Sequence, residues 1–209
     1  MVLVGTIELT LGSQRGEFYC PACRDHRSYR RKVRRAFVTL YFIPVIPLGK
    51  TAEFVICDTC RQPFEPWVLE RPADEIEAML RAAACDHVLR VMILTMLADE
   101  VVSDEEDRVL RSYYRHISGK ELTNEQLQFE IEQLTASGLT PALYGAQAAD
   151  ELTDREREEM VIGAFLVASA SGPLSDAQLD ELQLLPTALG IDENRFRELI
   201  AEAMEFEGA

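Results

Sequence analysis

Residues 18–65 decide the fold of the amino-terminal part of the chain: FYCPACRDHRSYRRKVRRAFVTLYFIPVIPLGKTAEFVICDTCRQPFE. A cysteine pair lies near each end of this stretch, and two residues separate the members of each pair. That spacing lets both sulfurs of a tight turn face one ion, so two such turns supply four thiolates for tetrahedral Zn²⁺. Four protein ligands leave no position for water, which is typical of a structural site. We therefore expect one structural zinc ion held by Cys20, Cys23, Cys57 and Cys60.

Two other uses of paired cysteines stay open at this point. A redox CxxC motif uses one pair beside a βαβ pattern, whereas these two pairs flank short strand-like segments. An iron–sulfur centre is the second alternative for four thiolates. His26 follows the first pair and could serve as a spare ligand, but with four cysteines present we expect it to be a surface residue. Cys85, alone on an apolar helix face, is expected to be a small buried hydrophobe.

The segment TLYFIPVIPLGK, residues 39–50, is among the most apolar parts of the chain. Pro44 and Pro47 exclude a helix here, and an unpaired extended backbone is costly in hydrocarbon. We expect a strand that ends in a proline-shaped turn and packs on the ribbon or on the helical half. Insertion into a bilayer interface, or an exposed apolar patch for a partner, is the alternative.

The preceding segment RDHRSYRRKVRR is strongly basic, with seven Lys or Arg in residues 24–35. One interpretation is a strand that contacts the phosphates of a nucleic acid, and an anionic lipid surface is another. A solvated strand face is the third interpretation, which we favour because the net charge of −15 repels polyanions. The candidate polyanion-binding residues are Arg24, Arg27, Arg30, Arg31, Lys32, Arg34 and Arg35.

The charge changes sign near residue 70, from +3 over residues 1–70 to −18 over residues 71–209. Such an asymmetry indicates two modules. We expect an α+β two-domain chain with a small zinc-ribbon β domain at 1–66, a linker and lead-in helix at 67–84, and an all-α domain at 85–209. The start has no basic n-region, and no run reaches the ~18 apolar residues of a spanning helix, so we expect a cytoplasmic protein.

Residues 74–209 contain repeated helix-start signals. Four segments have the form of a capping box, in which a hydroxyl residue is followed three positions later by Glu or Gln. They begin at Ser103, Thr123, Thr153 and Ser175. With the other start and stop signals they predict about seven helices. Residues 97–110 also align with residues 170–182, and each copy follows an apolar helix, which predicts a pseudo-symmetric bundle.

The motifs of residues 18–65 resemble the zinc-ribbon modules of bacterial proteins. Those modules share a C-P-x-C knuckle, a basic strand, a segment of the form F-I-P-[VIL]-[IFL]-P-[LI]-G-K and a second C-x-x-C, in this order. The resemblance implies a zinc-bound β module and leaves its partner open.

Residues 85–206 resemble the TerB-like family, which is named for tellurite-resistance proteins and is related to the N-terminal domains of some DnaJ-type co-chaperones. The segments that carry the resemblance are LADEVVSDEEDRVL and ASASGPLSDAQLDEL, which are similar to the doubled A-D-G-x-[IV]-s-x-x-E element of the family. The family implies an all-α bundle with a pseudo-two-fold repeat. It also implies a divalent cation held by the Asp and Glu of each element.

By position, Asp99 and Glu106 would be the cation ligands of the first element, although Glu100 stands where the family has Gly. The second element has Ser171 and Gln178 in place of both carboxylates. A matched pair of acidic sites is therefore not present, and the capping-box interpretation explains Gln178 better than cation binding does.

Motifs for catalysis are not evident: the chain has three histidines, and no nucleophile elbow, phosphate-binding glycine loop or HExxH. We expect a non-enzymatic adaptor or sensor, with protein partners, in a bacterial stress or envelope-associated response. The alternatives are a nucleic-acid-binding regulator acting through residues 24–35 and a divalent-metal-dependent activity near Asp99. Peripheral membrane association is a further option, and no small-molecule substrate is indicated.

Overall fold

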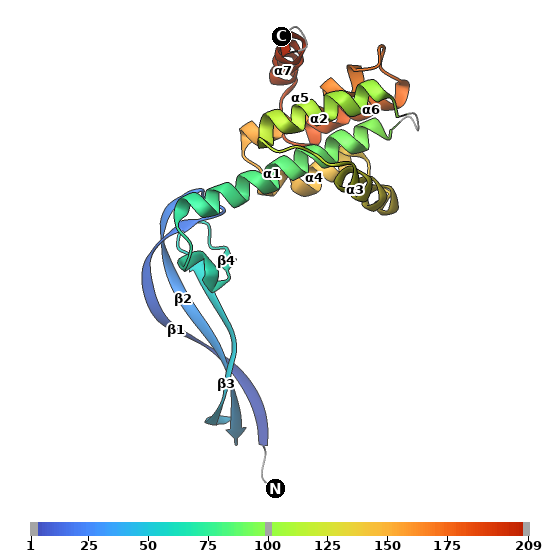
Figure 1. Ribbon diagram of the computed structural model, residues 1–209. Coiled ribbons are helices and arrows are strands. Elements are labelled where there is room, and N and C mark those ends of the chain that lie inside the picture. Colours follow the sequence, from blue (N-terminus) through green and yellow to red (C-terminus); the bar gives the residue numbers. More distant parts are fainter. Residues whose placement is uncertain (1–3, 99–101, 207–209) are drawn as a thin grey trace. The chain divides into compact units, whose positions relative to one another are not determined.

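The computed structural model describes residues 4–98 and 102–206 (Figure 1). Contacts divide the chain into two compact units, Met1–Leu80 and Arg81–Ala209. An antiparallel sheet forms most of the first unit and helices form the second, so the predicted α+β organisation is confirmed. The long helix α1, Ala73–Met96, begins in the first unit and continues into the second.

The sheet consists of β1 (Val4–Cys20), β2 (Asp25–Leu40), β3 (Ile43–Cys57) and the short β4 (Pro63–Phe64), in the order β1-β2-β3-β4. All three pairings are antiparallel, as is usual for strands joined by short turns. Strand β2 lies in the middle and pairs along its length with β1, so residues far before the first cysteine pair belong to the same sheet.

The core of this sheet lies at the end that carries the cysteines. Its buried residues are Phe18, Cys20, Tyr29, Val55, Cys57 and Val68. The rings of Phe18 and Tyr29 meet edge to face with centroids 5.5 Å apart, a favourable arrangement for aromatic pairs. The 3-10 helix η1, Pro66–Leu69, follows β4 and adds Val68 to the core and Trp67 to its margin.

The opposite end of the sheet is the turn between β2 and β3, and its position corrects the sequence prediction. The turn is formed by Tyr41 and Phe42, between the paired residues Leu40 and Ile43, whereas both prolines lie inside β3. Tyr41 and Phe42 have φ of 51° and 68°, as a two-residue type I′ turn requires. Such left-handed conformations cost a residue with a side chain roughly 1–2 kcal/mol, and they are unusual for bulky residues.

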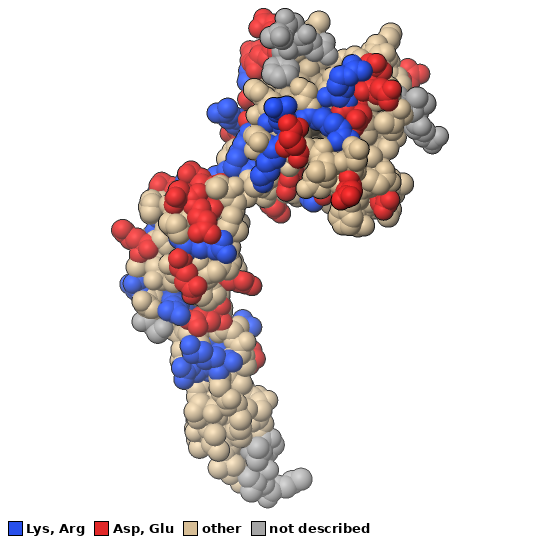
Figure 2. Space-filling model, viewed as in Figure 1, with Lys and Arg blue, Asp and Glu red and all other residues tan. Residues whose placement is uncertain are grey.

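The prolines are accommodated by irregularities at the sheet edge. The pairing of β3 with β2 shifts register close to Pro44 and again close to Pro47. Proline lacks a backbone N–H, so it is tolerated only at an edge or a bulge. The side chains of residues 40–50 are exposed, and the predicted packing on other parts of the ribbon is therefore wrong. On the face shown in Figure 2, this end of the sheet carries no charged residue.

Within the second unit and the part of α1 before it, the described residues form seven α-helices, as predicted. After α1 they are α2 (Asp104–Ser118), α3 (Asn124–Ser137), α4 (Pro141–Ala148), α5 (Asp154–Ser169), α6 (Asp176–Ala188) and α7 (Glu193–Phe206), with the 3-10 helix η2 (Ala149–Glu151) between α4 and α5. None of the described helices is both long enough and apolar enough to cross a membrane.

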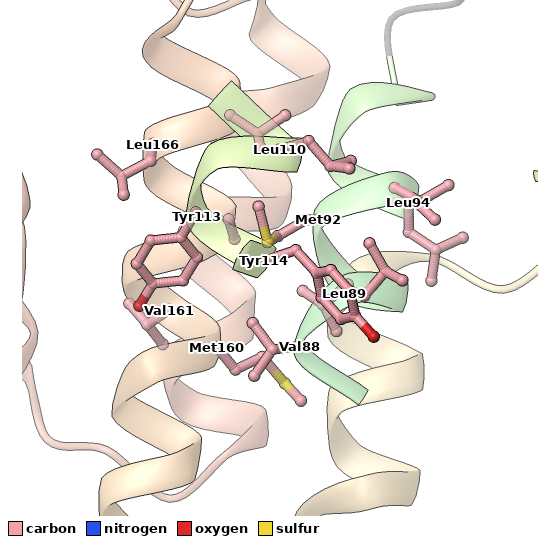
Figure 3. Packing of buried hydrophobic residues seen from close by; sticks show 14 of the residues in the cluster. Val88, Leu89, Met92, Leu94, Leu110, Tyr113, Tyr114, Met160, Val161 and Leu166 are labelled. Atoms are coloured by element: carbon pink, nitrogen blue, oxygen red, sulfur yellow. The ribbon is translucent and has the colours of Figure 1, made fainter. Parts of the chain in front are cut away.

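Helices α1 and α5 form the centre of the helical unit. Residues 91–96 of α1 are buried on every face, which is the pattern of a helix surrounded by others. Figure 3 shows Met92 of α1 beside side chains of α2 and α5. Gly163 of α5 permits this close approach, because a Cβ there would lie 3.0 Å from both Met92 and Tyr113. These two central helices are the apolar segments that precede the two copies of the sequence repeat.

All four predicted capping boxes are present. Ser103, Thr123, Thr153 and Ser175 each cap a helix, and in each case the Glu or Gln three residues later accepts from the backbone N–H of the capping residue. Thr140 also caps a helix, α4, and Gly190 has a left-handed conformation, with φ of 73°, just after the end of α6. The helix boundaries therefore follow from local hydrogen bonding at the positions that the sequence indicates.

Candidate metal centre

The first cysteine pair occupies the turn between β1 and β2. Cys20 is the last residue of β1 and pairs with Asp25, the first residue of β2. Cys23 lies in the turn, and Arg24 after it has φ of 48°. The left-handed residue reverses the chain, so that β2 can return along β1 while both sulfurs stay on the inner side of the turn.

The second pair repeats this arrangement after β3. Cys57 ends the strand, Cys60 lies in the turn, and Arg61 has φ of 65°. The backbone N–H of Arg61 donates to the Cys57 carbonyl at 3.1 Å, and the Cys57 N–H donates to the Gln62 carbonyl at 3.2 Å. The two turns thus have equivalent left-handed residues, one position after the second cysteine of each pair. Glycine would be the residue expected from conformational preference alone.

The four sulfurs converge to one point. They all lie within 4.8 Å of one another, with 3.7 Å between Cys20 and Cys60 and 4.0 Å between Cys23 and Cys57. Four thiolates at ~2.3 Å from a tetrahedral Zn²⁺ are about 3.8 Å apart, whereas a disulfide requires ~2.05 Å. The distances fit four ligands of one metal ion, and all four cysteines are free thiols.

Strand register brings the two turns together. Tyr29 of β2 pairs with Cys57, and the Asp58 N–H donates to the Ser28 carbonyl at 2.9 Å. Because β2 also pairs with β1 up to Cys20, one strand fixes both cysteine turns at the same end of the sheet. The 33-residue spacer between the pairs is therefore a long β-hairpin that returns to its starting point.

The pKa values of the Cys20 and Cys57 thiols shift in opposite directions. Burial raises the pKa of the Cys20 thiol well above its usual range. Burial also raises the pKa of the Cys57 thiol, but backbone N–H groups of Cys60 and Thr59 outweigh it and lower the pKa to about 7. The Thr59 N–H lies 3.4 Å from the Cys57 sulfur. Such N–H groups stabilise a thiolate, which is the form that binds a metal.

His26 is not part of the cluster. Its side chain is exposed, and its ring meets that of Tyr19 with centroids 5.8 Å apart. This agrees with the expectation of a surface histidine. Cys85, the fifth cysteine, is buried in α1, where its sulfur lies 3.5 Å from the Ile117 carbonyl and burial raises its pKa. It is the small buried residue that the sequence predicted.

The basic residues of β2 do not form a single surface. Alternation along the strand places Arg27, Arg31 and Arg35 on the same side as the buried Tyr29 and Val33. By the same alternation Arg30, Lys32 and Arg34 lie on the other side. Arg24 is outside the strand, in the first cysteine turn.

Several of these cations are paired with carboxylates of the same sheet. Arg27 contacts Asp25 at 3.0 Å and Arg30 contacts Asp58 at 2.6 Å. Arg31 pairs with Glu53, and Arg34 lies 3.8 Å from Glu8. In the described part of the chain, Lys32 and Arg35 have no ion-pair partner. The segment is thus less basic in effect than its composition suggests.

The second predicted metal site is only partly described. Asp99 lies outside the described residues. Glu106 is buried at the start of α2, where one carboxyl oxygen accepts from the Ser103 N–H and hydroxyl, each at 2.9 Å. Its other oxygen accepts from the Gln178 amide at 3.1 Å. Among the described residues, three or more side chains whose ligand atoms lie close enough together to hold one metal ion are found at the four cysteines.

The contact between Glu106 and Gln178 joins the two copies of the sequence repeat. Each residue is the third residue of its helix and completes a capping box, so each already binds the backbone of its own turn. Both are almost fully buried. The sequence alignment indicated that the two segments are equivalent, but it held no signal that they touch.

A second polar network was also missed by sequence reasoning. Arg90 donates to both carboxyl oxygens of Glu130 and, at 3.3 Å, to the Tyr144 hydroxyl. The Tyr144 hydroxyl in turn lies 2.8 Å from His87 Nδ1. These residues join α1, α3 and α4, and their positions along the chain show no motif.

Comparisons of the chain with family models, with curated proteins and with solved structures found no match.

Proposed function

We propose that the chain is a zinc-binding, non-enzymatic interaction protein. The observation that supports this proposal is the convergence of four cysteine sulfurs at distances that suit tetrahedral thiolate ligation. Four thiolates saturate Zn²⁺, so the ion would stabilise the sheet and would have no open position for a substrate. A sheet whose core lies almost entirely beside the cysteines depends on that ion for its order.

The proposed adaptor or sensor role rests on the surfaces of the sheet and of the helical unit, and on the resemblance of residues 85–206 to TerB-like proteins. Two buried carboxyl groups of the helical unit support a role without catalysis. Glu106 and Glu156 complete capping boxes and are thereby committed to structure. On this proposal the zinc-stabilised sheet and the helical unit each bind a protein, in a bacterial stress or envelope-associated response. A nucleic-acid role has less support, since the cations of β2 are divided between two faces and largely paired.

Metal analysis of the purified full-length protein tests the zinc centre. We expect one zinc per chain in the wild type, retention of zinc in Cys85→Ser, and loss of zinc in Cys57→Ser. Cys85→Ser is the matched control, because Cys85 is a buried cysteine outside the cluster. Iron in place of zinc, or equal zinc in wild type and Cys57→Ser, would contradict the proposal.

The same variants test whether the zinc-stabilised sheet is the interaction surface. Proteins captured by wild type and by Cys85→Ser, but lost with Cys57→Ser, are the expected result. Structural zinc sites contribute about 10–16 kcal/mol to the folding of small domains at neutral pH. We therefore expect Cys57→Ser to unfold the sheet while the helical circular dichroism signal is kept. Partners retained by Cys57→Ser would assign the interaction to the helical unit instead.

A further inference from the structure

The end of the sheet opposite the cysteines is an exposed apolar surface. We define the apolar tip as residues 36–49 of β2 and β3 together with residues 5–7 of β1. Its exposed large side chains are Ile7, Leu40, Tyr41, Phe42, Ile43, Val45, Ile46 and Leu48. Phe42, at the turn, is 83% exposed. An exposed apolar surface bounded by polar residues marks a contact with a protein or a membrane.

The charge changes abruptly along this hairpin. The apolar tip contains no Asp, Glu, Lys or Arg, whereas the residues directly behind it are basic. We define the basic collar as Lys32, Arg34, Arg35 and Lys50. Arg35 stands directly opposite Lys50 in the β2–β3 ladder, an arrangement of like charges that is unfavourable without an anion nearby. Glu8 and Glu53 offset part of the collar and leave it net positive.

Most backbone hydrogen-bonding groups of the apolar tip are paired within the sheet. Strand β2 pairs with β1 on one side and with β3 on the other up to the Tyr41–Phe42 turn. On the β3 edge, Pro44 and Pro47 have no N–H to leave unpaired. The cost of placing an unpaired extended strand in an apolar medium therefore does not apply to the central strand, and it is reduced at the β3 edge.

The turn itself has residues that conformational preference disfavours. Asn-Gly is the preferred pair for a turn with positive φ at both positions, yet this turn holds Tyr41 and Phe42. Strained backbone that carries an exposed side chain is evidence from which a functional role can be inferred. Here the strain presents two aromatic rings at the extreme of the sheet, and aromatic side chains favour the membrane–water interface.

We propose that the apolar tip inserts into the interface of an anionic phospholipid membrane, with the basic collar on the lipid headgroups. Charge complementarity selects this occupant. Two copies of the chain joined tip to tip would bring two basic collars together, and a nucleic acid would gain nothing from aliphatic side chains. An anionic bilayer surface offers an apolar acyl-chain boundary and a layer of negatively charged headgroups. The aromatic and aliphatic side chains of the tip suit the first, and the lysine and arginine side chains of the collar suit the second. This inference goes beyond the adaptor role, because it assigns the tip a lipid partner.

Vesicle co-sedimentation of the full-length, zinc-loaded protein tests the proposal. Wild type is expected to sediment with vesicles of phosphatidylcholine and phosphatidylserine, and weakly with phosphatidylcholine alone. The double variant Tyr41→Asn/Phe42→Gly removes both rings and installs the preferred turn pair, so it should fold at least as well as wild type. We expect its binding to fall by at least about tenfold, the loss that burial of two aromatic side chains implies. Phe129→Ala, at an exposed phenylalanine of α3, is the matched control and should bind as wild type does.

The collar and the depth of insertion are tested separately. Arg35→Gln/Lys50→Gln should weaken binding to phosphatidylserine vesicles by about fivefold for each charge, and should leave binding to phosphatidylcholine unchanged. Phe42→Trp places an indole at the tip, and its emission should shift to shorter wavelength when anionic vesicles are added.

Five results would overturn the proposal. Four of them are no sedimentation with anionic vesicles, undiminished sedimentation of Tyr41→Asn/Phe42→Gly, an unshifted Phe42→Trp emission, and a wild-type dimer that the tip variant converts to monomers. The last result would assign the tip to self-association. Sedimentation with vesicles that RNA competes away, together with equal RNA binding by the tip variant, would likewise assign the surface to polyanions and not to lipid.

Discussion

Replacing Gln178 with glutamate should destabilise the helical unit strongly at neutral pH and only slightly in acid. The Gln178 amide donates to Glu106 across 3.1 Å, and both side chains are almost fully buried. Q178E has the same shape and keeps a carbonyl-type oxygen for the Ser175 N–H, so the capping box survives. The change replaces the amide donor of Gln178 with a second carboxyl group, which faces the carboxyl group of Glu106.

The size of the loss follows from the distance and from proton binding. Two carboxylates 3.1 Å apart repel each other by about 5 kcal/mol at an effective dielectric constant of 20. The pair avoids this repulsion by holding one proton, as carboxylate dyads do. Holding a proton at about pH 7 on a group with an ordinary pKa of about 4.3 costs about 3.7 kcal/mol, at 1.36 kcal/mol per unit. We therefore expect a loss of about 3–4 kcal/mol near pH 7.

The pH dependence has a defined sign. The folded variant binds a proton that the unfolded chain releases, so its stability falls as pH rises above about 4.3. Urea unfolding followed by far-ultraviolet circular dichroism at about pH 7 and about pH 5 measures the change. Gln126→Glu is the matched control, because Gln126 holds the same place in an exposed capping box, and among the described residues no buried carboxyl group faces it as Glu106 faces Gln178. A glutamate there should be neutral or stabilise by a few tenths of a kcal/mol. If Q178E and Q126E differ by less than about 0.5 kcal/mol near pH 7, the buried contact is refuted.

Two further predictions concern one contact in each unit. Arg195 of α7 lowers the pKa of the Glu158 carboxyl through two hydrogen bonds of 2.7 and 2.9 Å, so this pair stabilises the fold above the unfolded pKa, and the contribution is lost as pH falls through the folded pKa. Glu158→Gln should therefore cost about 0.5–1 kcal/mol at neutral pH in urea unfolding, and the difference should disappear in acid. In the sheet, a Cβ at Gly16 would lie 2.9 Å from the Tyr29 ring, so Gly16→Ala should destabilise it by about 1–3 kcal/mol. Trp67, the one tryptophan of the chain, reports that unfolding by fluorescence, and Gly12→Ala, in open space, is the control that should show no comparable loss.

Features set by short-range geometry were predictable from the sequence. Two-residue spacing within each cysteine pair determines that both sulfurs face the same side of a turn. The four capping boxes marked helix starts correctly, because a hydroxyl and a carboxyl or amide three residues apart satisfy the free N–H groups of a first turn wherever the helix lies. The switch from a β-rich to a helical part was likewise visible in composition.

Features that depend on which segments meet were not predictable. The prolines of residues 39–50 suggested a turn, but the strand register places the turn at Tyr41 and Phe42 and the prolines on a sheet edge. The run of cations left a polyanion surface open beside the favoured solvated strand face. Only the structure shows that pairing with carboxylates that lie far along the chain neutralises much of its charge.

The sequence by itself determined the local elements: two cysteine turns, a set of capped helices and an acidic repeat. Tertiary structure decided how they are used. Register along β2 brought two turns 37 residues apart to one set of four sulfurs, and it left the apolar tip exposed at the other end. Helix packing made Gln178 the partner of a buried carboxyl group and not only a cap. The reason is physical: spacing along the chain fixes contacts within a turn, whereas burial and pairing between distant segments exist only once the whole unit has folded.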